Sequence, residues 1–380
     1  MSVQFLSVLS SNAMRAIVLL FFVTISMAGL GQGVKTPRAS KMATVSEEVG
    51  ITDVTISYSR PAVNGREGKI WGDLVPYGFV DYHYGTSKAA PWRAGANENT
   101  TIEFSTNVTI EGAPLAAGKY GFFVAMGQEK ATLVFSRDNN AWGSFYYDPA
   151  NDALRVEVPV VKTTESAERL KYEFTAETDS SAVVELRWEK VRIPFSVAVD
   201  VKKTQLDAYR YAFNSGNFYE YWQNMQLAAD FCLVNNVDIE EGLTWAHRSI
   251  NTYFGEANFR TLSTYAGLLS MAGRKHEADS LMKVAFPKGS TDDLYSYGTK
   301  LLHLKMNKEA FDAFQFGYNK APKEWVANFG LAKGYAALGD KASALKYAEA
   351  CLRLTTDHNA KEYVGRFKQD VVDGKDVLGF

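Results

Sequence analysis

Hydrophobic and polar residues alternate with a period of two through the first half of the chain. The alternation is clearest in "VTISYS" (54–59), "TIEFS" (101–105), "ATLVFS" (131–136), "LRVEV" (154–158) and "VRIPFSVAV" (191–199). Turn signals such as "YYDPAND" (146–152) separate these segments. Many short alternating segments without helices between them predict an antiparallel β domain over residues 35–200, with a β-sandwich as the preferred architecture and a barrel as the alternative.

The period changes near residue 200, and nearly everything that follows repeats at helical spacing. Small alanines recur in these helices at Ala246, Ala278, Ala310 and Ala344, which are 32, 32 and 34 residues apart. An alanine at such a position lets two helices cross closely. The pattern therefore predicts a helical repeat domain over residues 201–380.

Around two of these alanines the sequence resembles tetratricopeptide repeats. Gly298, Ala310, Phe314 and Pro322 fall at the spacings of one repeat, and Tyr335, Gly339 and Ala344 fall at those of the next. The resemblance covers about residues 230–358 and implies an α-helical solenoid, because one helix pair cannot bury its own apolar face. Such solenoids usually present a groove to a protein or peptide partner. The alternative is a structural cap on the β domain.

The N-terminus has the layout of a secretory signal peptide. In "MRAIVLLFFVTISMAGLGQG" (14–33), Arg15 precedes an apolar run, and small residues follow it. Residues 1–28 are therefore expected to be a signal peptide, with Met14 as an alternative start, and the protein is expected to be periplasmic or extracellular. A membrane anchor is disfavoured because the apolar run is shorter than the roughly 20 residues of a span. No membrane span is predicted after signal cleavage.

Composition excludes several classes of function. The net charge is −2, so there is no electrostatic footprint for nucleic acid. No cofactor fingerprint occurs, and neither Cys232 nor Cys351 has neighbours at metal-ligand spacing. No cofactor or metal is therefore predicted. Whether the two cysteines form a disulfide or stay free is open at this point.

A candidate site follows from the faces of two strands. Glu98 shares a face with Ile102 and Phe104 if its strand extends back that far, and Arg60 ends the inward face of the earlier strand. An inward carboxylate needs a cationic partner, because desolvating an unpaired charge is costly. Arg60 is the expected partner of Glu98, and Arg66 and Arg93 are further candidates.

Two interpretations of this cluster remain open. It is either a structural network that pins the loop from 61 to 97, or a pocket for an anionic or polyhydroxy small ligand such as a glycan. The residues of the candidate pocket are Arg60, Arg66, Arg93, Asn97 and Glu98, with Trp71, Tyr77 and Trp92 as aromatic platforms.

An enzymatic alternative rests on paired carboxylates. Glu98 with Asp73 or Asp81 is a conceivable pair for a glycan-type hydrolase. No nucleophile motif accompanies them, and His83, which is the one histidine of the β domain, reads as solvated loop surface. We therefore assign no catalytic residue and expect a binding or scaffold protein more than an enzyme.

A series of motifs also resembles a bacterial secreted family, the domain of unknown function 2911. The motifs are "PRAS" (37–40), "YSRPAVNGRE" (58–67), "LVPYG" (74–78), "WRAGANENTTI" (92–102), "LAAGKYGFF" (115–123) and "WGSFYYD" (142–148). The resemblance covers about residues 35–200 and implies a secreted β domain, and it implies no activity. The chain departs from the family in "FVDYHYGTSKAAP" (79–91), which is longer than the usual link.

Overall fold

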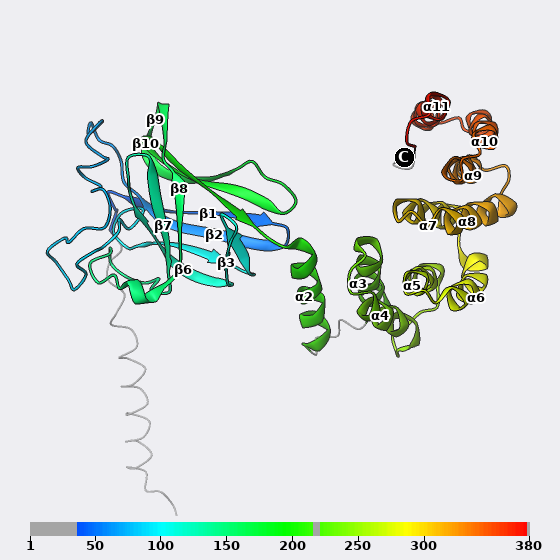
Figure 1. Cartoon of the computed structure of the whole chain (residues 1–380), viewed down its shortest axis with the longest axis horizontal. Helices are drawn as coiled ribbons and strands as arrows, with labels where there is room; N and C mark the ends of the chain where they lie inside the picture. Colours follow the sequence, from blue (N-terminus) through cyan, green and yellow to red (C-terminus); the bar gives the residue numbers. More distant parts are fainter. Residues whose placement is uncertain (1–35, 216–220, 378–380) are drawn as a thin grey trace, which may run out of the picture. The chain divides into compact units, whose positions relative to one another are not determined.

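The computed structural model describes residues 36–215 and 221–377. The chain divides between Val199 and Asp200 into two compact units, which we call the β unit and the helical unit. Figure 1 shows strands in the first unit and helices in the second. Among the helices of the described residues, none combines the length and the apolar character needed to cross a membrane.

The β unit contains two antiparallel sheets (Figure 1). The six-stranded sheet has the order β1 (Lys41–Val49), β2 (Thr52–Arg60), β3 (Thr100–Phe104), β6 (Gly118–Ala125), β7 (Lys130–Ser136) and β8 (Asp152–Pro159). The four-stranded sheet has the order β5 (Ala113–Leu115), β4 (Val108–Ile110), β10 (Ser181–Ala198) and β9 (Val161–Thr175). A 3₁₀ turn, η1 (Pro149–Asn151), precedes β8. The predicted antiparallel strands are confirmed.

The two sheets share one apolar core. The inward positions of β2 are buried, as the alternation in its sequence requires. Phe122 of the six-stranded sheet contacts Phe195 and Tyr172 of the four-stranded sheet, with ring centroids 5.5 and 6.1 Å apart. Aromatic rings from both sheets therefore meet across the interior.

The long connection between β2 and β3 is fixed to the sheets. Backbone bridges join Tyr77 to Met126 and Trp92 to Val124. Within the segment 79–91, Val80 and Ala90 exchange backbone hydrogen bonds of 3.0 and 2.8 Å. The bridges to Val124 and Met126 hold this connection against β6 and the residue that follows it.

Ten α-helices follow in the described part of the helical unit. They are α2 (Val201–Asn214), α3 (Trp222–Asn235), α4 (Ile239–Asn251), α5 (Phe259–Met271), α6 (Lys275–Ala285), α7 (Thr291–His303), α8 (Asn307–Lys320), α9 (Trp325–Ala337), α10 (Lys341–Leu354) and α11 (His358–Asp373). A 3₁₀ turn, η2 (Phe286–Lys288), follows α6. Capping boxes at Asn258 and Ser290 satisfy the first amides of α5 and α7, which explains where these helices begin.

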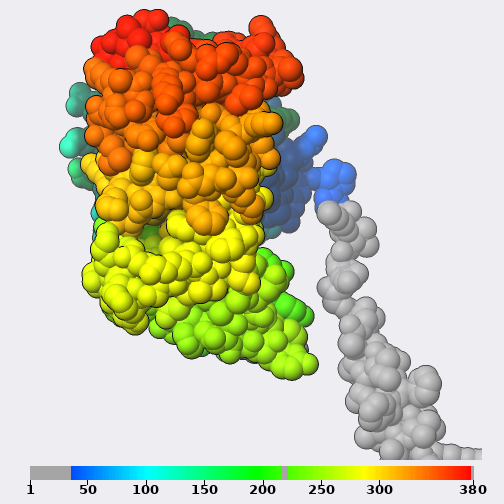
Figure 2. Space-filling view, turned by 90° about the vertical axis from the view of Figure 1, so that its right-hand side faces the viewer, coloured from blue at the N-terminus to red at the C-terminus, as the bar shows by residue number. Residues whose placement is uncertain are grey.

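The helices pack in chain order, as the colour bands from yellow to red in Figure 2 show. Ala246, Ala278, Ala310 and Ala344 are all buried. Phe314 of α8 packs against Gly298 of α7 and Gly330 of α9, where an added Cβ would lie 2.4 and 2.6 Å from its ring. Small residues thus set how closely successive helices approach. Cys232 and Cys351 are free, buried thiols, so they form no disulfide.

Candidate functional site

Glu98 has a different partner from the one predicted. Its Oε2 accepts a hydrogen bond of 2.8 Å from Arg38, whereas Arg60 donates to the Leu170 carbonyl. The predicted Arg60–Glu98 pair is therefore wrong. The reason is local: β3 begins at Thr100, and the left-handed backbone of Asn97 (φ 62°) breaks the alternation before it. As a result the neighbouring Asn99, and not Glu98, is buried.

The other polar residues of the predicted site are held by contacts within the β unit. Arg66 donates to the carbonyls of Ala62 and Val63 in its own loop. Arg93 donates to the Asn97 carbonyl at 2.7 Å and lies over the Phe145 ring. These contacts match the structural interpretation of the cluster. Ligand binding by these residues stays a prediction.

The carboxylates of the hydrolase alternative lie in separate contacts. The hydrogen bond from Arg38 lowers the pKa of Glu98. A hydrogen bond from the His83 amide lowers the pKa of Asp81, and Lys88 pairs with the same carboxylate at 3.2 Å. A general acid needs a raised pKa, so these shifts do not suit Glu98 or Asp81 to that role. Asp73 is exposed.

Arg38 and Arg93 differ in burial, so their replacement should affect the stability of the protein differently. Replacing Arg38 by Ala should change the melting temperature little, because its ion pair with Glu98 is solvent-exposed. Arg93→Ala should cost about 2 kcal/mol, because it empties the space beside Gly143 and leaves the Asn97 carbonyl without its donor. Urea unfolding of both variants measures the difference. Equal losses would contradict this assignment.

The three predicted aromatic residues lie at different depths. Trp92 is buried and stacks on Trp188 at 6.0 Å, so it is a core residue. Trp71 and Tyr77 instead line a pocket of about 250 Å³ at the edge of the β unit, which we call the aromatic pocket. Its other walls come from the β6–β7 turn, the start of β9 and residues 189–191 of β10. Two of the eight predicted site residues therefore line one pocket.

A second pocket, which the sequence did not predict, lies in the helical unit. It has a volume of about 330 Å³ and lies among α5, α6, α7 and α8; we call it the inter-repeat pocket. Met282, Phe286, Tyr297 and Met306 give it apolar walls. These residues read as ordinary core positions in the sequence, because helical spacing does not distinguish a filled interior from a pocket wall.

The rim of the inter-repeat pocket carries charges of both signs. Its acidic and basic residues are Lys275, Asp279, Lys283, Lys308, Glu309 and Asp312. Lys275 and Glu309 form an ion pair at 2.6 Å. Partial burial acts to raise the pKa of Glu309, but the hydrogen bond from Lys275, a backbone hydrogen bond and the nearby lysine charges together lower it. Burial raises the pKa of Tyr297 in the wall, so this phenol stays protonated and able to donate.

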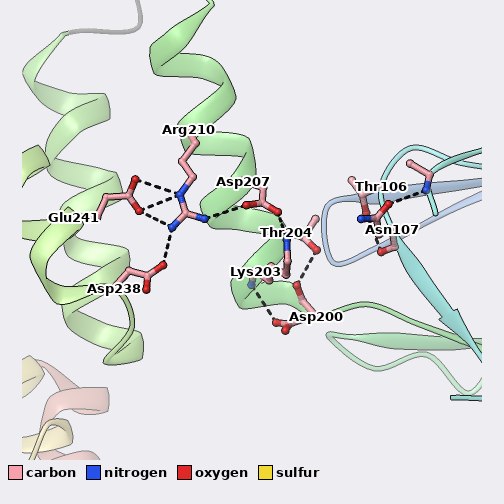
Figure 3. A network of polar contacts seen from close by, with 10 residues as sticks. Thr106, Asn107, Asp200, Lys203, Thr204, Asp207, Arg210, Asp238 and Glu241 are labelled. Carbon is pink, nitrogen blue, oxygen red and sulfur yellow. Dashed lines mark hydrogen bonds and ion pairs between the residues drawn. The ribbon is translucent and has the colours of Figure 1, made fainter. Parts of the chain in front are cut away.

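A charged cluster ties α2 to the start of α4 (Figure 3). Arg210 donates to Glu241 at 3.0 and 2.6 Å and to Asp238 at 2.7 Å. It also pairs with Asp207 on its own helix. The hydrogen bonds that it donates to Glu241 and the other carboxylates raise the pKa of Arg210 further. All three carboxylates are paired with this one guanidinium, so we interpret the cluster as structural.

A polar row crosses the odd-numbered helices α3 to α9. Asp230, Thr264, Thr299 and Lys333 are 34, 35 and 34 residues apart and so occupy equivalent repeat positions. Thr264 donates to Asp230 at 3.3 Å, and Lys333 donates to Thr299 at 3.2 Å. Lys300 of α7 also pairs with Asp230 of α3, the residue to which Thr264 of α5 donates. This bridge links α3 to α7 across the row.

Comparison with known proteins finds a family model that matches the β unit. Residues 40–197 match the model of a family described as protein of unknown function (DUF2911). The resemblance seen in the sequence motifs is therefore confirmed for this part of the chain. None of the curated proteins compared with the chain matches it.

Solved structures of tetratricopeptide-repeat (TPR) type match the helical region. YrrB, described as a TPR protein with an unusual peptide-binding site, is 15% identical with a TM-score of 0.26, and the match covers 43% of this chain and 84% of YrrB. MamA from Desulfovibrio magneticus RS-1 is 14% identical with a TM-score of 0.25, covering 40% and 93%. Another MamA structure is 13% identical with a TM-score of 0.28, covering 44% and 91%. At these values we transfer no property of those proteins.

Proposed function

We propose that the protein is an exported interaction scaffold, in which a β-sandwich is followed by a solenoid of tetratricopeptide-like helix pairs that binds a protein partner. The inter-repeat pocket carries this proposal. It lies between two successive helix pairs, where a solenoid offers its inter-repeat surface. Export rests on the proposed signal peptide at 1–28, which lies outside the described residues.

The walls and rim of the pocket define the partner segment. Met282 and Met306 are flexible, polarizable side chains that adapt to differently shaped apolar groups. Lys308 and Asp279 on the rim offer charges of either sign to flanking residues. A peptide with one buried apolar anchor and charged neighbours fits this arrangement, because interfaces concentrate their binding energy in such an anchor.

Blocking the pocket tests the proposal. A photo-activated crosslinking residue is placed at Asp279 in the full chain, expressed in the source cells, and covalent adducts are sized after irradiation. We expect a discrete protein adduct that is lost with Ser270→Trp, because residue 270 lines the pocket and the indole fills it.

Ser280→Trp is the matched control. Ser280 is exposed on α6 and is not one of the pocket residues, so the same substitution should leave the adduct intact. Absence of any adduct at Asp279, or an adduct that survives Ser270→Trp, would reject binding at this pocket. Circular dichroism of both variants confirms that the helices remain folded.

A further inference from the structure

A β-bulge in β10 turns Glu189 toward the aromatic pocket. The pairing of β10 with β9 shifts register on both sides of this residue. Glu189 has φ 51°, the left-handed region that residues other than glycine and asparagine rarely adopt. Bulges often redirect one side chain, and strained backbone is concentrated at functional sites. Here the bulge makes Glu189 a wall of the pocket.

The carboxylate of Glu189 is buried without a cationic partner. The residue is 8% exposed, and its Oε2 accepts a hydrogen bond of 2.7 Å from the Lys190 amide. Within residues 36–215 and 221–377, no basic side chain forms an ion pair with it. Glu185 of the same strand is equally buried but pairs with Arg192 at 3.0 Å. Lys162 and Lys190 also line the pocket, but within the described residues neither forms an ion pair with Glu189, so its carboxylate stays available to a bound cation.

The aromatic walls are already in place. Trp71 packs edge-on against Trp92 and Trp188, with ring centroids 5.7 and 5.8 Å apart. Tyr77 lies so close to Gly72 that a Cβ there would be 2.5 Å from its ring. Gly72 itself has φ 90°, which favours glycine. Both rings are therefore positioned before any ligand arrives, which lowers the entropic cost of binding.

We propose that the aromatic pocket binds an organic ammonium ion carried on an aromatic or apolar body. The ammonium group pairs with Glu189, and its body lies against Trp71 and Tyr77. Ring faces attract cations, and the carboxylate supplies the opposite charge in a largely desolvated place. The volume of about 250 Å³ suits a single aryl-alkyl amine. The charge preference is opposite to the anionic ligand expected from the arginines in the sequence.

Three matched probes test the charge preference. Phenethylamine, 2-phenylethanol and phenylacetate share one aromatic body and differ in their polar group. Calorimetric titration of the full chain at pH 7 should show phenethylamine binding at least about tenfold more tightly than 2-phenylethanol, in line with one charge-assisted hydrogen bond. Phenylacetate should not bind. Equal binding of the amine and the alcohol, or no binding of the amine, would overturn the proposal.

Variants of Glu189 separate binding from folding. Glu189→Gln should abolish the advantage of the amine over the alcohol. Glu189→Gly removes the carboxylate and also relieves the left-handed backbone, so it should melt at a higher temperature and still fail to bind the amine. Glu157→Gln, at an exposed carboxylate on β8, should keep wild-type binding. If either Glu189 variant bound the amine as tightly as the wild type, the amine would bind at another place and the proposal would be refuted.

Discussion

Replacing Gly298 by Ala is expected to destabilise the wild-type protein and to stabilise a Phe314→Ala variant. In the wild type the new Cβ would lie 2.4 Å from a ring carbon of Phe314, so helices α7 and α8 would have to separate. Phe314→Ala alone should cost about 3–5 kcal/mol, because the ring is almost fully buried and leaves a cavity. In that background the Cβ added at position 298 fills part of the space, and alanine favours the helix over glycine by about 1 kcal/mol.

Denaturant unfolding of the two single variants and the double variant measures this sign change. Gly365→Ala is the matched control, since it lies in α11 with no atom within 4 Å of its added Cβ. It should stabilise the protein by about 1 kcal/mol in both backgrounds. If Gly298→Ala had the same effect with and without Phe314, the close packing of α7 and α8 would be disproved.

Lys333→Met is expected to change how stability depends on pH. Burial lowers the pKa of Lys333 from its ordinary 10.5 to about 8. Below pH 8 the lysine is protonated in both the folded and the unfolded state, and burying its charge costs the most. Between pH 8 and 10.5 only the unfolded state holds the proton, so the wild type gains stability as the pH rises.

The wild type should therefore gain up to about 3 kcal/mol relative to Lys333→Met between pH 7 and pH 10.5. Urea unfolding at several pH values measures the difference between the two proteins. Lys361→Met, at an exposed position of α11, controls for loss of a positive charge. A wild-type advantage that falls as the pH rises would show that Lys333 is stabilised in its charged form.

The fold could be predicted from the sequence wherever the apolar residues of a strand or helix pattern are also the buried ones. Alternation located β2 and β3 because their inward residues reach one shared core. The alternation did not locate β9. This edge strand has charged and polar residues on both faces, so its sequence lacks a clear period of two. The helical alanines were correctly placed at buried positions, since a close helix crossing tolerates only a small side chain.

The candidate site was less predictable because backbone irregularities decide it. The left-handed Asn97 moved Glu98 out of the face predicted for it. Arg38 precedes the first strand, so no strand count could pair it with Glu98. Glu189 lies in "RWEKVRI", where the adjacent polar residues Glu189 and Lys190 interrupt the alternation at the bulge. One such break does not by itself distinguish a bulge from the end of a strand. Trp71 and Tyr77 were found because aromatic residues in a loop are conspicuous in any sequence.

The two sheets end in the edge strands β1 and β8 of one sheet and β5 and β9 of the other. Backbone hydrogen bonds with Pro61 and Val63 cover part of the outer edge of β9, at Glu168 and Leu170. Long open edges are templates for pairing with another copy, which leads to aggregation. The two longest of these edges carry many charges: "KMATVSEEV" in β1 and "VKTTESAERLKYEFT" in β9. Bringing two such edges together would draw these charged side chains out of water, so the charged edges protect the β unit from growing into a fibre.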